Sequence, residues 1–477
     1  MTVRQAVQIP SREQDFSEWY TAVCLRAELA DYAPVRGMMV IRPYGYALWE
    51  GMQRWLDARF KATGHVNAAF PVLIPESLLR REAEHVQGFA PQVAWVTHGG
   101  DEELEERLAV RPTSEAIIMP MYARWVQSYR DLPILIVLWN SVVRWEKATR
   151  LFLRTREFYW HEGHTAHRTE EEAEREALLI LDIYREFVEQ VLAIPVLVGR
   201  KPPSERFAGA QRTYTLEALM PDAQAIQAGT SHYFGQNFGR AFDIRFLDAD
   251  NQEKYVSTTS WAISSRIIGA LVMAHGDDRG LQLPPAIAPY QVVIVPIPGK
   301  DGEAVRQRAA ELAARLEQRF RVTLDDREQY TPGWKFHEWE LRGVPVRLEL
   351  GPRDLQRGQV VLVPRTGGEK ETVALERLED ALARLLDSVQ QTLFERGQAY
   401  LRAHIVEART VDEVAAHIQA QRGFVRVGWC EVQACEDRLR EATGASPRVI
   451  PLDDVPEGTC IVCGQPARAT VYWARAY

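Results

Sequence analysis

The chain has 477 residues, of which 46% are hydrophobic and 26% are charged, and its formal net charge is -8. This composition is typical of a globular chain with several domains and excludes a disordered or fibrous protein. The net acidic charge also excludes a basic surface along the whole chain of the kind that binds nucleic acids non-specifically, although it permits a local basic surface. No stretch reaches the roughly 18 apolar residues of a membrane span, and residues 1–16 lack the apolar core of a signal peptide. We therefore expect no membrane contact and a cytoplasmic location.

The first half of the chain mixes expected helices and strands. Apolar residues recur at helical spacing over 16–27 and place Cys24 on the buried face, where a thiol is inert. A second helix is expected over 46–63, and a strand over 67–74 in which Pro71 requires an edge or an interface. The remaining predicted elements of this half are strands at 134–138, 156–160 and 212–216 and a helix over 170–192.

Prolines interrupt every periodic pattern at 281–289, which predicts a linker. After it the pattern changes to the strand–helix alternation that is typical of an α/β domain with a mainly parallel or mixed sheet. Its predicted elements are strands at 292–297, 344–350 and 359–363 and helices at 303–319 and 376–402. We therefore expect three domains, with boundaries at 1–286, 287–402 and 403–477.

Four of the five cysteines lie close together in the last domain: Cys430, Cys435, Cys460 and Cys463. The spacing C-x4-C and C-x2-C predicts two knuckles around one tetrahedral structural zinc ion. Two disulfides and an iron–sulfur cluster are the alternatives. A reducing cytoplasm disfavours the disulfides, and the absence of any visible redox-partner site disfavours the cluster. Four thiolates leave no open position for a substrate, so the zinc would stabilise the small domain.

The chain contains neither a P-loop nor a GxGxxG dinucleotide-binding loop, so any phosphate would be bound by arginines. Two segments offer them: Val143-Arg-Trp-Glu146 with Arg154-Thr-Arg-Glu-Phe158, and Ser260 to Arg266 at the start of an apolar helix. Together with the helix and strand around Pro71, these segments resemble motifs 2, 3 and 1 of class II aminoacyl-tRNA synthetases, in the order and at the intervals of that class.

Further segments resemble the prolyl-tRNA synthetases of the archaeal and eukaryotic type. They are Arg111-Pro-Thr-Ser-Glu115, Trp160 to His167, Gly229 to Gly235, His275 to Leu281, Pro332-Gly-Trp-Lys335 and Gly351-Pro-Arg-Asp354. The resemblance covers essentially the whole chain. It implies an α+β catalytic domain with an antiparallel sheet flanked by helices, an α/β anticodon-binding domain and a small zinc-binding α+β C-terminal domain. It also implies a homodimer formed through motif 1.

The resemblance implies ATP-dependent activation of L-proline with Mg²⁺ and transfer of the prolyl group to the 3′ end of tRNA(Pro). The implied catalytic residues are Arg144 and Arg266, because a guanidinium can bridge the proline carboxylate and the α-phosphate, two anions that repel. The implied proline-binding residues are Thr113, Glu115, Arg144, Trp160, Glu162, His164, Ser231 and His232. The implied ATP-binding residues are Arg144, Glu146, Arg156, Phe158, Gln224, Gln227, Thr230, Ser264 and Arg266. In this family the terminal tyrosine, here Tyr477, folds back toward the active site.

Three alternatives remain open at this point. His161, His164 and His167 could hold a metal, but their spacing does not match the zincin signature, and neighbouring aromatic residues favour a pocket wall or a core. A threonyl or glycyl synthetase of the same subclass is a second alternative. Threonyl enzymes use a cysteine as a zinc ligand in the active site, whereas Cys24 lies far upstream of the motifs. A non-catalytic RNA-binding paralogue is the third alternative, and such paralogues typically lose one of the two arginines kept here.

Overall fold

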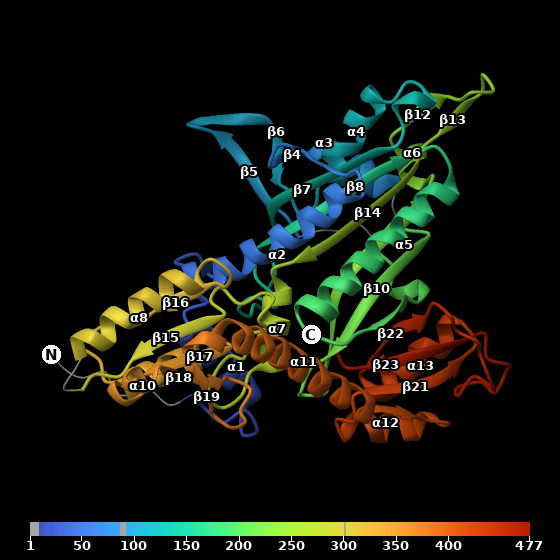
Figure 1. Cartoon of the computed structure of the whole chain (residues 1–477). Coiled ribbons are helices and arrows are strands. Elements are labelled where there is room, and N and C mark those ends of the chain that lie inside the picture. The colour runs from blue at the N-terminus through green and yellow to red at the C-terminus, as the bar shows by residue number, and fades with distance from the viewer. Residues whose placement is uncertain (1–8, 86–91, 300–301) are drawn as a thin grey trace.

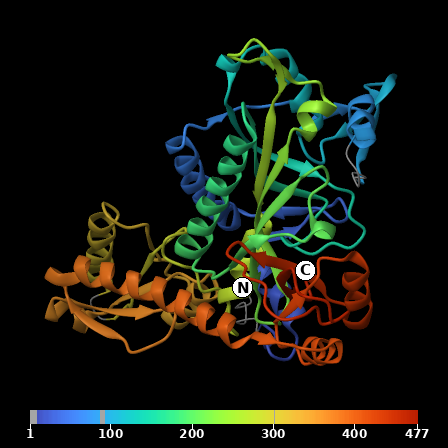
Figure 2. The same cartoon turned by 90° about the vertical axis from the view of Figure 1, so that its right-hand side faces the viewer.

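The computed structural model describes residues 9–85, 92–299 and 302–477 (Figures 1 and 2). Figure 1 shows a large part built around long strands, a second part with its own sheet, and a small C-terminal part in red. The sheet of the second part has five strands. Figure 2 shows the second and third parts on opposite sides of the molecule, below the long strands. Among the described residues, no helix combines the length and the apolar character needed to cross a membrane.

One eleven-stranded sheet runs through both the large part and the C-terminal part, in the order β20-β21-β23-β22-β9-β10-β11-β14-β8-β7-β3. Neighbouring strands from β22 to β7 are all antiparallel, which confirms the expected antiparallel catalytic sheet. The two outermost strands, β3 and β20, each join their edge in parallel. The strands of the large part are β3 (Val66–Asn67), β7 (Ile134–Val143), β8 (Glu157–His167), β9 (Leu197–Arg200), β10 (Arg212–Leu219), β11 (Ala225–Gly235) and β14 (Ser257–Ser264).

Helix α5 (Glu170–Glu186) covers one face of this sheet and packs on β10, β11 and β14. It begins at Thr169, whose hydroxyl accepts a hydrogen bond from the backbone N–H of Glu172, while the Glu172 carboxylate accepts one in return. Its acidic first turn also suits the positive end of the helix dipole. The prediction of a helix over 170–192 is confirmed as far as Glu186, after which Phe187–Val191 form a π-helical turn.

The helices predicted near the N-terminus are confirmed as α1 (Phe16–Arg26) and α2 (Pro43–Ala62). Cys24 is fully buried on α1, as expected. Helix α2 starts three residues before the predicted position because Pro43 occupies its first turn, where the missing N–H is not needed. The other elements of the large part are β1 (Ala30–Tyr32), β2 (Met39–Ile41), β4 (Leu73–Pro75), α3 (Glu76–His85), β5 (Ala94–Gly99), β6 (Glu102–Val110), α4 (Glu115–Trp125), α6 (Asn237–Ala241), β12 (Arg245–Leu247), β13 (Glu253–Tyr255) and α7 (Arg266–His275).

The single strand predicted over 67–74 is wrong. The structure divides this stretch into β3, which pairs with β7, and β4, which pairs with β6 in a different sheet. Residues 68–72 between them belong to no strand. Pro71 has no N–H to donate to a ladder, so the chain leaves one sheet before it and enters the next one after it.

The second part has the mixed α/β fold that was predicted. Its sheet has the order β16-β15-β17-β18-β19, in which β15 is parallel to both β16 and β17 and the other pairs are antiparallel. Its elements are β15 (Val292–Pro296), α8 (Gly302–Leu316), β16 (Val322–Leu324), α9 (Pro332–Leu341), β17 (Val346–Leu350), α10 (Pro352–Arg357), β18 (Gln359–Pro364), β19 (Glu371–Ala374) and α11 (Leu378–Ala403). In Figure 1, α11 leads from this part to the C-terminal part.

The C-terminal part attaches to the large part edge to edge. Strand β22 pairs with β9 through Ile450 opposite Arg200 and Pro451 opposite Gly199, a joint that the sequence did not predict. A side chain at position 199 would place its Cβ 2.1 Å from the carbonyl oxygen of Ile450, so only glycine permits this approach. The elements of the C-terminal part are β20 (Ile405–Glu407), α12 (Val411–Gln419), β21 (Phe424–Trp429), α13 (Gln433–Thr443), β22 (Ser446–Pro451) and β23 (Ala469–Ala474).

We predict that Gly199→Ala lowers the free energy of unfolding by roughly 3 kcal/mol, because the new methyl group overlaps the backbone of β22 and forces the two strands apart. Thermal unfolding measures the loss. Gly333→Ala is the matched control, since Gly333 lies in helix α9 and a Cβ there meets nothing within 4 Å. The control should change stability by less than about 1 kcal/mol. Equal midpoints for the two variants would contradict the close approach at the joint.

Candidate active site and cysteine cluster

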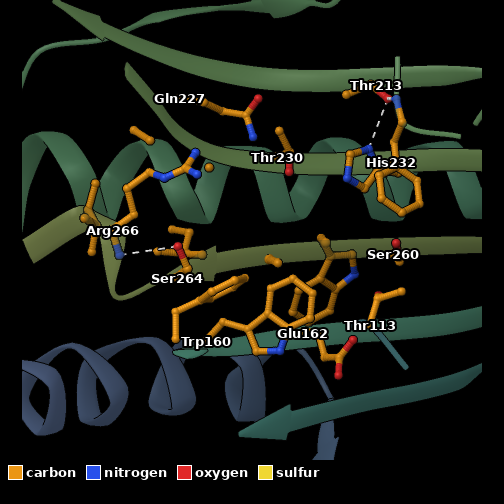
Figure 3. A pocket seen from close by; sticks show the side chains of 18 of the residues that line it. Thr113, Trp160, Glu162, Thr213, Gln227, Thr230, His232, Ser260, Ser264 and Arg266 are labelled. Carbon is orange, nitrogen blue, oxygen red and sulfur yellow. Dashed lines mark hydrogen bonds between the residues drawn. The ribbon is translucent and has the colours of Figure 1, made fainter. Parts of the chain in front are cut away.

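A cavity of about 200 Å³ lies on the face of the central sheet that is turned away from α5. Figure 3 shows how neighbouring strands contribute to it: Thr213 comes from β10, Gln227, Thr230 and His232 from β11, Ser260 and Ser264 from β14, and Trp160 and Glu162 from β8. Because side chains alternate between the two faces of a strand, pairs such as Thr230 and His232 reach the cavity together. The sheet therefore holds side chains distant in sequence in a fixed relation.

Arg144 enters the cavity from the end of β7. Its Nε donates a hydrogen bond of 3.0 Å to the carbonyl oxygen of Pro112. Its guanidinium lies over the rings of Phe158 and Trp160, at 5.4 and 5.3 Å from their centroids. Burial lowers the pKa of Arg144, and the nearby carboxylate of Glu115 acts in the opposite direction. An arginine remains charged under these conditions, so the cavity contains one fixed cation.

Arg266 supplies a second cation at the first residue of α7. Its Nε donates to the carbonyl oxygen of Leu153 at 2.9 Å, and its backbone N–H lies 3.3 Å from the hydroxyl of Ser264. Burial lowers the pKa of Arg266, and the positive charge of Arg144 lowers it further. Two guanidinium groups that face one cavity form a site for a polyanion.

Acidic residues gather at the other end of the cavity. Glu162 accepts hydrogen bonds from Asn140 at 2.9 Å and from the hydroxyl of Ser114, and it lies 2.9 Å from Nε2 of His164. Burial opposes the charged form of both members of this pair. Their mutual hydrogen bond nevertheless holds the pKa of Glu162 below its usual value and that of His164 above it. Beside them, the Thr113 hydroxyl donates to the buried carboxylate of Glu115.

Flat rings line the space between the acidic and basic ends. Trp160 donates from its indole nitrogen to Asn140 at 2.7 Å, which fixes its ring at the cavity wall. Phe207 stacks on His232 with 4.5 Å between centroids. Burial, together with the charge of His164, lowers the pKa of His232 to about 3, so this ring is neutral, and its Nδ1 lies 3.0 Å from the hydroxyl of Thr213. The cavity therefore suits a small apolar group that carries a positive charge at one end and an anion at the other.

The structure brings together most of the predicted site residues, which were expected from widely separated segments. Those that line the cavity are Thr113, Glu115, Arg144, Phe158, Trp160, Glu162, His164, Gln227, Thr230, His232, Ser264 and Arg266. Four predicted residues, Glu146, Arg156, Gln224 and Ser231, do not line it. Phe207, Thr213 and Glu205 line it although the sequence did not indicate them. No local motif marks these three: Glu205 and Phe207 are placed by how the segment before β10 folds over the sheet, and Thr213 by its position on β10.

Ser231 lies on the other face of β11, which corrects the prediction that it lines the proline slot. Its neighbours Thr230 and His232 both face the cavity, and Ser231 between them points to the opposite face of the strand. The Ser231 hydroxyl donates instead to the carbonyl oxygen of Ala177 on α5, at 2.7 Å. Successive side chains of a strand point to opposite faces, so a motif that follows a strand contains both cavity-facing and helix-facing residues.

Glu146 and Arg156 lie on the outer side of the loop between β7 and β8. The Glu146 carboxylate accepts from Arg154 at 3.0 Å. The Arg156 guanidinium lies over the Trp145 ring at 4.3 Å and donates to the carbonyl oxygen of Arg36 at 2.8 Å. These contacts occupy both side chains with protein partners next to the cavity rather than inside it.

Gln224 lies in a separate hollow, where its amide donates to Asp222 at 2.8 Å. The hydroxyl of Tyr477 donates to the same carboxylate, and its ring lies 5.7 Å from the Arg150 guanidinium of the β7–β8 loop. The end of the chain therefore folds back onto the large part of the molecule, beside this hollow and outside the cavity that holds Arg144.

The three histidines of β8 do not converge on a metal site. His164 faces the cavity, whereas His161 packs among aromatic rings that include Phe60 and Trp139. Burial lowers the pKa of His161 to about 3 and that of His167 to about 4. Both are neutral residues of the interior, as the predominant sequence interpretation proposed.

The four cysteines of the C-terminal part form a compact cluster. Their sulfur atoms all lie within 4.8 Å of one another, and none forms a disulfide. Burial raises the pKa of Cys460, but the backbone amides of Cys463 and Val462 outweigh this effect and bring it to about 7. Gly464 takes a left-handed conformation, φ +72°, which closes the tight turn around Cys460. Four converging sulfurs, one of them favoured as a thiolate, are compatible with a zinc ion.

Three family descriptions match consecutive parts of the chain. "tRNA synthetase class II core domain (G, H, P, S and T)" matches residues 95–275, and "Anticodon binding domain" matches residues 291–385. "Prolyl-tRNA synthetase, C-terminal" matches residues 411–477. The antiparallel sheet with arginines at the end of β7 and the start of α7, together with these matches, defines an aminoacyl-tRNA ligase with the class II synthetase core.

Curated relatives match the chain from end to end. The chain is 54% identical to "Proline--tRNA ligase" of Natranaerobius thermophilus and 53% identical to "Proline--tRNA ligase" of Alkaliphilus oremlandii, with 98% of each chain covered. It is 49% identical to "Proline--tRNA ligase 2" of Bacillus cereus over the full length of both chains. The chain belongs to the proline–tRNA ligase family.

The buried state of His161 predicts a pH dependence of stability. Its pKa is about 3 in the folded chain, against about 6.5 for an unfolded histidine. Between these values the unfolded chain binds a proton that the folded chain does not, so stability falls as the pH decreases from 7 to 5 by about 2 kcal/mol from this residue. Calorimetric midpoints at the two pH values, compared with those of His161→Leu, measure the effect.

The variant should lose less stability than the wild type on acidification, because it has no imidazole to protonate. His98→Leu serves as the control, since His98 is exposed on β5, and it should keep the wild-type pH dependence. A His161→Leu variant that loses as much stability as the wild type would show that His161 is protonated or exposed in the folded protein.

Proposed function

We propose that the chain activates L-proline with ATP and Mg²⁺ and transfers the prolyl group to the 3′ end of tRNA(Pro). One observation carries the proposal: Arg144 and Arg266 face the same small cavity as Glu115 and Glu162, with flat rings between the two ends. Proline is a small apolar ring with an ammonium and a carboxylate, and it matches this arrangement. The names of the full-length relatives support proline as the amino acid.

In the proposed first step, a carboxylate oxygen of proline attacks the α-phosphorus of ATP and pyrophosphate leaves. Both reactants are anions, so the main barrier is electrostatic. Arg144 lies between the acidic end and the second arginine, where its guanidinium can bind the carboxylate and the α-phosphate together. Arg266 binds the remaining phosphates, and Mg²⁺, when bound, neutralises further phosphate charge. In the second step the terminal ribose hydroxyl attacks the prolyl carbonyl and AMP leaves.

The acidic end of the cavity receives the amino group of proline. The Glu115 carboxylate and the Thr113 hydroxyl are acceptors for the secondary ammonium, and Trp160 and His232 pack on its ring. His164 acts through Glu162, whose charge it stabilises.

The ATP-binding residues of the proposal are Arg144, Phe158, Gln227, Thr230, Ser264 and Arg266, with Phe158 stacking on the adenine. Glu146 and Arg156 act from the adjoining loop. Gln224 is not included in the proposed ATP-binding residues, because it lies in the separate hollow.

The alternative functions have less support. Threonyl and glycyl synthetases share the core family, but the match of residues 411–477 to a prolyl-tRNA synthetase C-terminal family favours proline. A non-catalytic RNA-binding paralogue would have no reason to keep both arginines in one cavity. The proposal also includes a homodimer formed through motif 1, a cytoplasmic location, and domains at 1–286, 287–402 and 403–477.

Zinc is the proposed occupant of the cysteine cluster. Cys430 follows β21, Cys435 lies in α13, and Cys460 and Cys463 lie on one loop, so a single ion would join three separate segments. Burial and the neighbouring thiols raise the pKa of Cys435, because thiolates at this distance repel each other unless a cation lies between them. The ion would stabilise the C-terminal part and has no proposed role in the chemical step.

We predict that metal analysis of the purified protein finds about one zinc per chain and that Cys460→Ser releases it. The variant should lose thermal stability in its C-terminal part while the catalytic part stays folded, as far-UV circular dichroism would show. Cys24→Ala is the control, because Cys24 is buried on α1 and does not belong to the cysteine cluster. This variant should retain its zinc. A stable wild-type protein that contains no zinc would overturn the assignment.

We predict that Arg144→Ala reduces proline-dependent pyrophosphate exchange by at least about 100-fold, because a transition-state contact to a developing charge is worth several kcal/mol. The far-UV circular dichroism of the variant should match that of the wild type. Exposed Arg377 provides the control, and Arg377→Ala should exchange at the wild-type rate. Assays of the wild type with proline, threonine and glycine identify the amino acid. Exchange by Arg144→Ala at a near-normal rate would refute the role of this residue.

A further inference from the structure

Residues 200–207, which we call the wall segment, contain Glu205 and Phe207, two residues that line the cavity near His232. Phe207 stacks on His232, and its backbone N–H donates to the Thr213 hydroxyl at 3.0 Å. Glu205, in the short helical turn Pro203–Glu205, lines the same cavity. The position of this segment therefore sets the width of the space in which the proposed substrate ring lies.

The C-terminal part holds the wall segment through helix α13. The Ser204 hydroxyl donates to the carboxylate of Glu436, which is completely buried. Nη2 of Arg440 donates to the same Glu436 carboxylate at 2.7 Å and to the Glu205 carboxylate at 3.1 Å. One nitrogen atom of the C-terminal part thus joins α13 to a residue that lines the cavity.

A second ion pair joins the beginning of the wall segment to the cysteine cluster. Arg200 lies 2.8 Å from the carboxylate of Glu431. Glu431 and Glu436 each directly follow a cysteine of the cluster, Cys430 and Cys435. The backbone at Glu431 is left-handed, φ +61°, a conformation that a non-glycine residue adopts only when its surroundings impose it. Both carboxylates are therefore placed by the backbone that also brings the cysteines together.

A third contact is fully buried beside the cavity. Glu217 on β10 accepts from Lys201 of the wall segment at 2.6 Å and from Arg448 on β22 at 3.0 Å. Glu217 is paired across the sheet with Gln227, which lines the cavity. A buried carboxylate with two cations is stable only while all three groups stay together, because a single charge left alone in the interior is strongly unfavourable.

From these contacts we propose that the C-terminal part positions the wall segment, with Glu436 and Arg440 as positioning residues that set the affinity for the amino-acid substrate. The C-terminal part contacts Arg200, Ser204 and Glu205 directly, and it reaches Lys201 through Glu217. Phe207 is held by the catalytic sheet. Loss of the α13 contacts therefore frees the middle of the wall and leaves its end attached. This inference rests on the proposed function, since it assumes that the cavity binds proline.

The first test compares two arginines of α13 in the full-length protein. Arg440→Ala removes the shared donor, whereas Arg438→Ala removes an exposed side chain two residues away. In pyrophosphate exchange, Arg440→Ala should raise the KM for proline about tenfold and leave the KM for ATP within about twofold, because the wall adjoins the amino-acid end. Arg438→Ala should match the wild type in both constants.

Two further variants separate positioning from general destabilisation. Arg440→Lys keeps a cation that can reach both carboxylates, because Arg440 uses only one nitrogen for them, and it should restore most of the affinity for proline. Glu436→Gln should raise the KM for proline as Arg440→Ala does. All of these variants should retain their zinc and their thermal midpoints within a few degrees.

Hydrogen exchange provides a readout that does not depend on activity. In Arg440→Ala, peptides that cover residues 203–207 should exchange faster, whereas peptides from β11 and β14 should keep their wild-type protection. The inference is overturned if wild type and Arg440→Ala have the same KM for proline and the same exchange in the wall segment. It is also overturned if both substrate KM values rise equally with a general loss of protection. A wild-type protein without proline-dependent exchange refutes the proposed function instead.

Discussion

Two buried positive charges that face one cavity are the constraint on which the rest of this structure depends. Arg144 and Arg266 come from segments far apart in the sequence. Burial lowers the pKa of both, and the positive charge of Arg144 lowers that of Arg266 further. Carbonyl oxygens of Pro112 and Leu153 fix their Nε atoms, and the acidic end of the cavity offsets part of their charge. Such an arrangement is stable only on a rigid support, which the antiparallel sheet supplies.

The buried carboxylates of the cavity need hydrogen-bond partners within the protein. Glu162 is surrounded by Ser114, Asn140 and His164, so its charge is stabilised without contact to solvent. Glu115 accepts a hydrogen bond from the Thr113 hydroxyl, and its charge raises the pKa of Arg144. The two carboxylates therefore differ in how many protein partners they have.

The C-terminal part extends the catalytic sheet instead of packing on it. Its strand β22 continues the ladder at β9, so the sheet that carries the arginines also carries the domain with the cysteine cluster. Backbone pairing and the buried Glu217 contacts make this connection stiff, and the wall segment lies where the two parts meet. The backbone that brings the four cysteines together is therefore connected to the cavity wall by direct contacts.

The sequence by itself determined the local features: the helix that begins at Thr169, the strand–helix alternation after the proline-rich linker, the convergence of four cysteines, and the motif residues Arg144 and Arg266. These depend on neighbours along the chain, and twelve of the sixteen residues predicted for the substrate sites line one cavity. The tertiary structure alone decided which face of β11 Ser231 occupies, where Gln224 lies, and that Phe207 and Glu205 form a wall. It also divided the predicted strand at Pro71 and joined β22 to β9. Such features depend on contacts between residues far apart in the chain, whose partners no local pattern specifies.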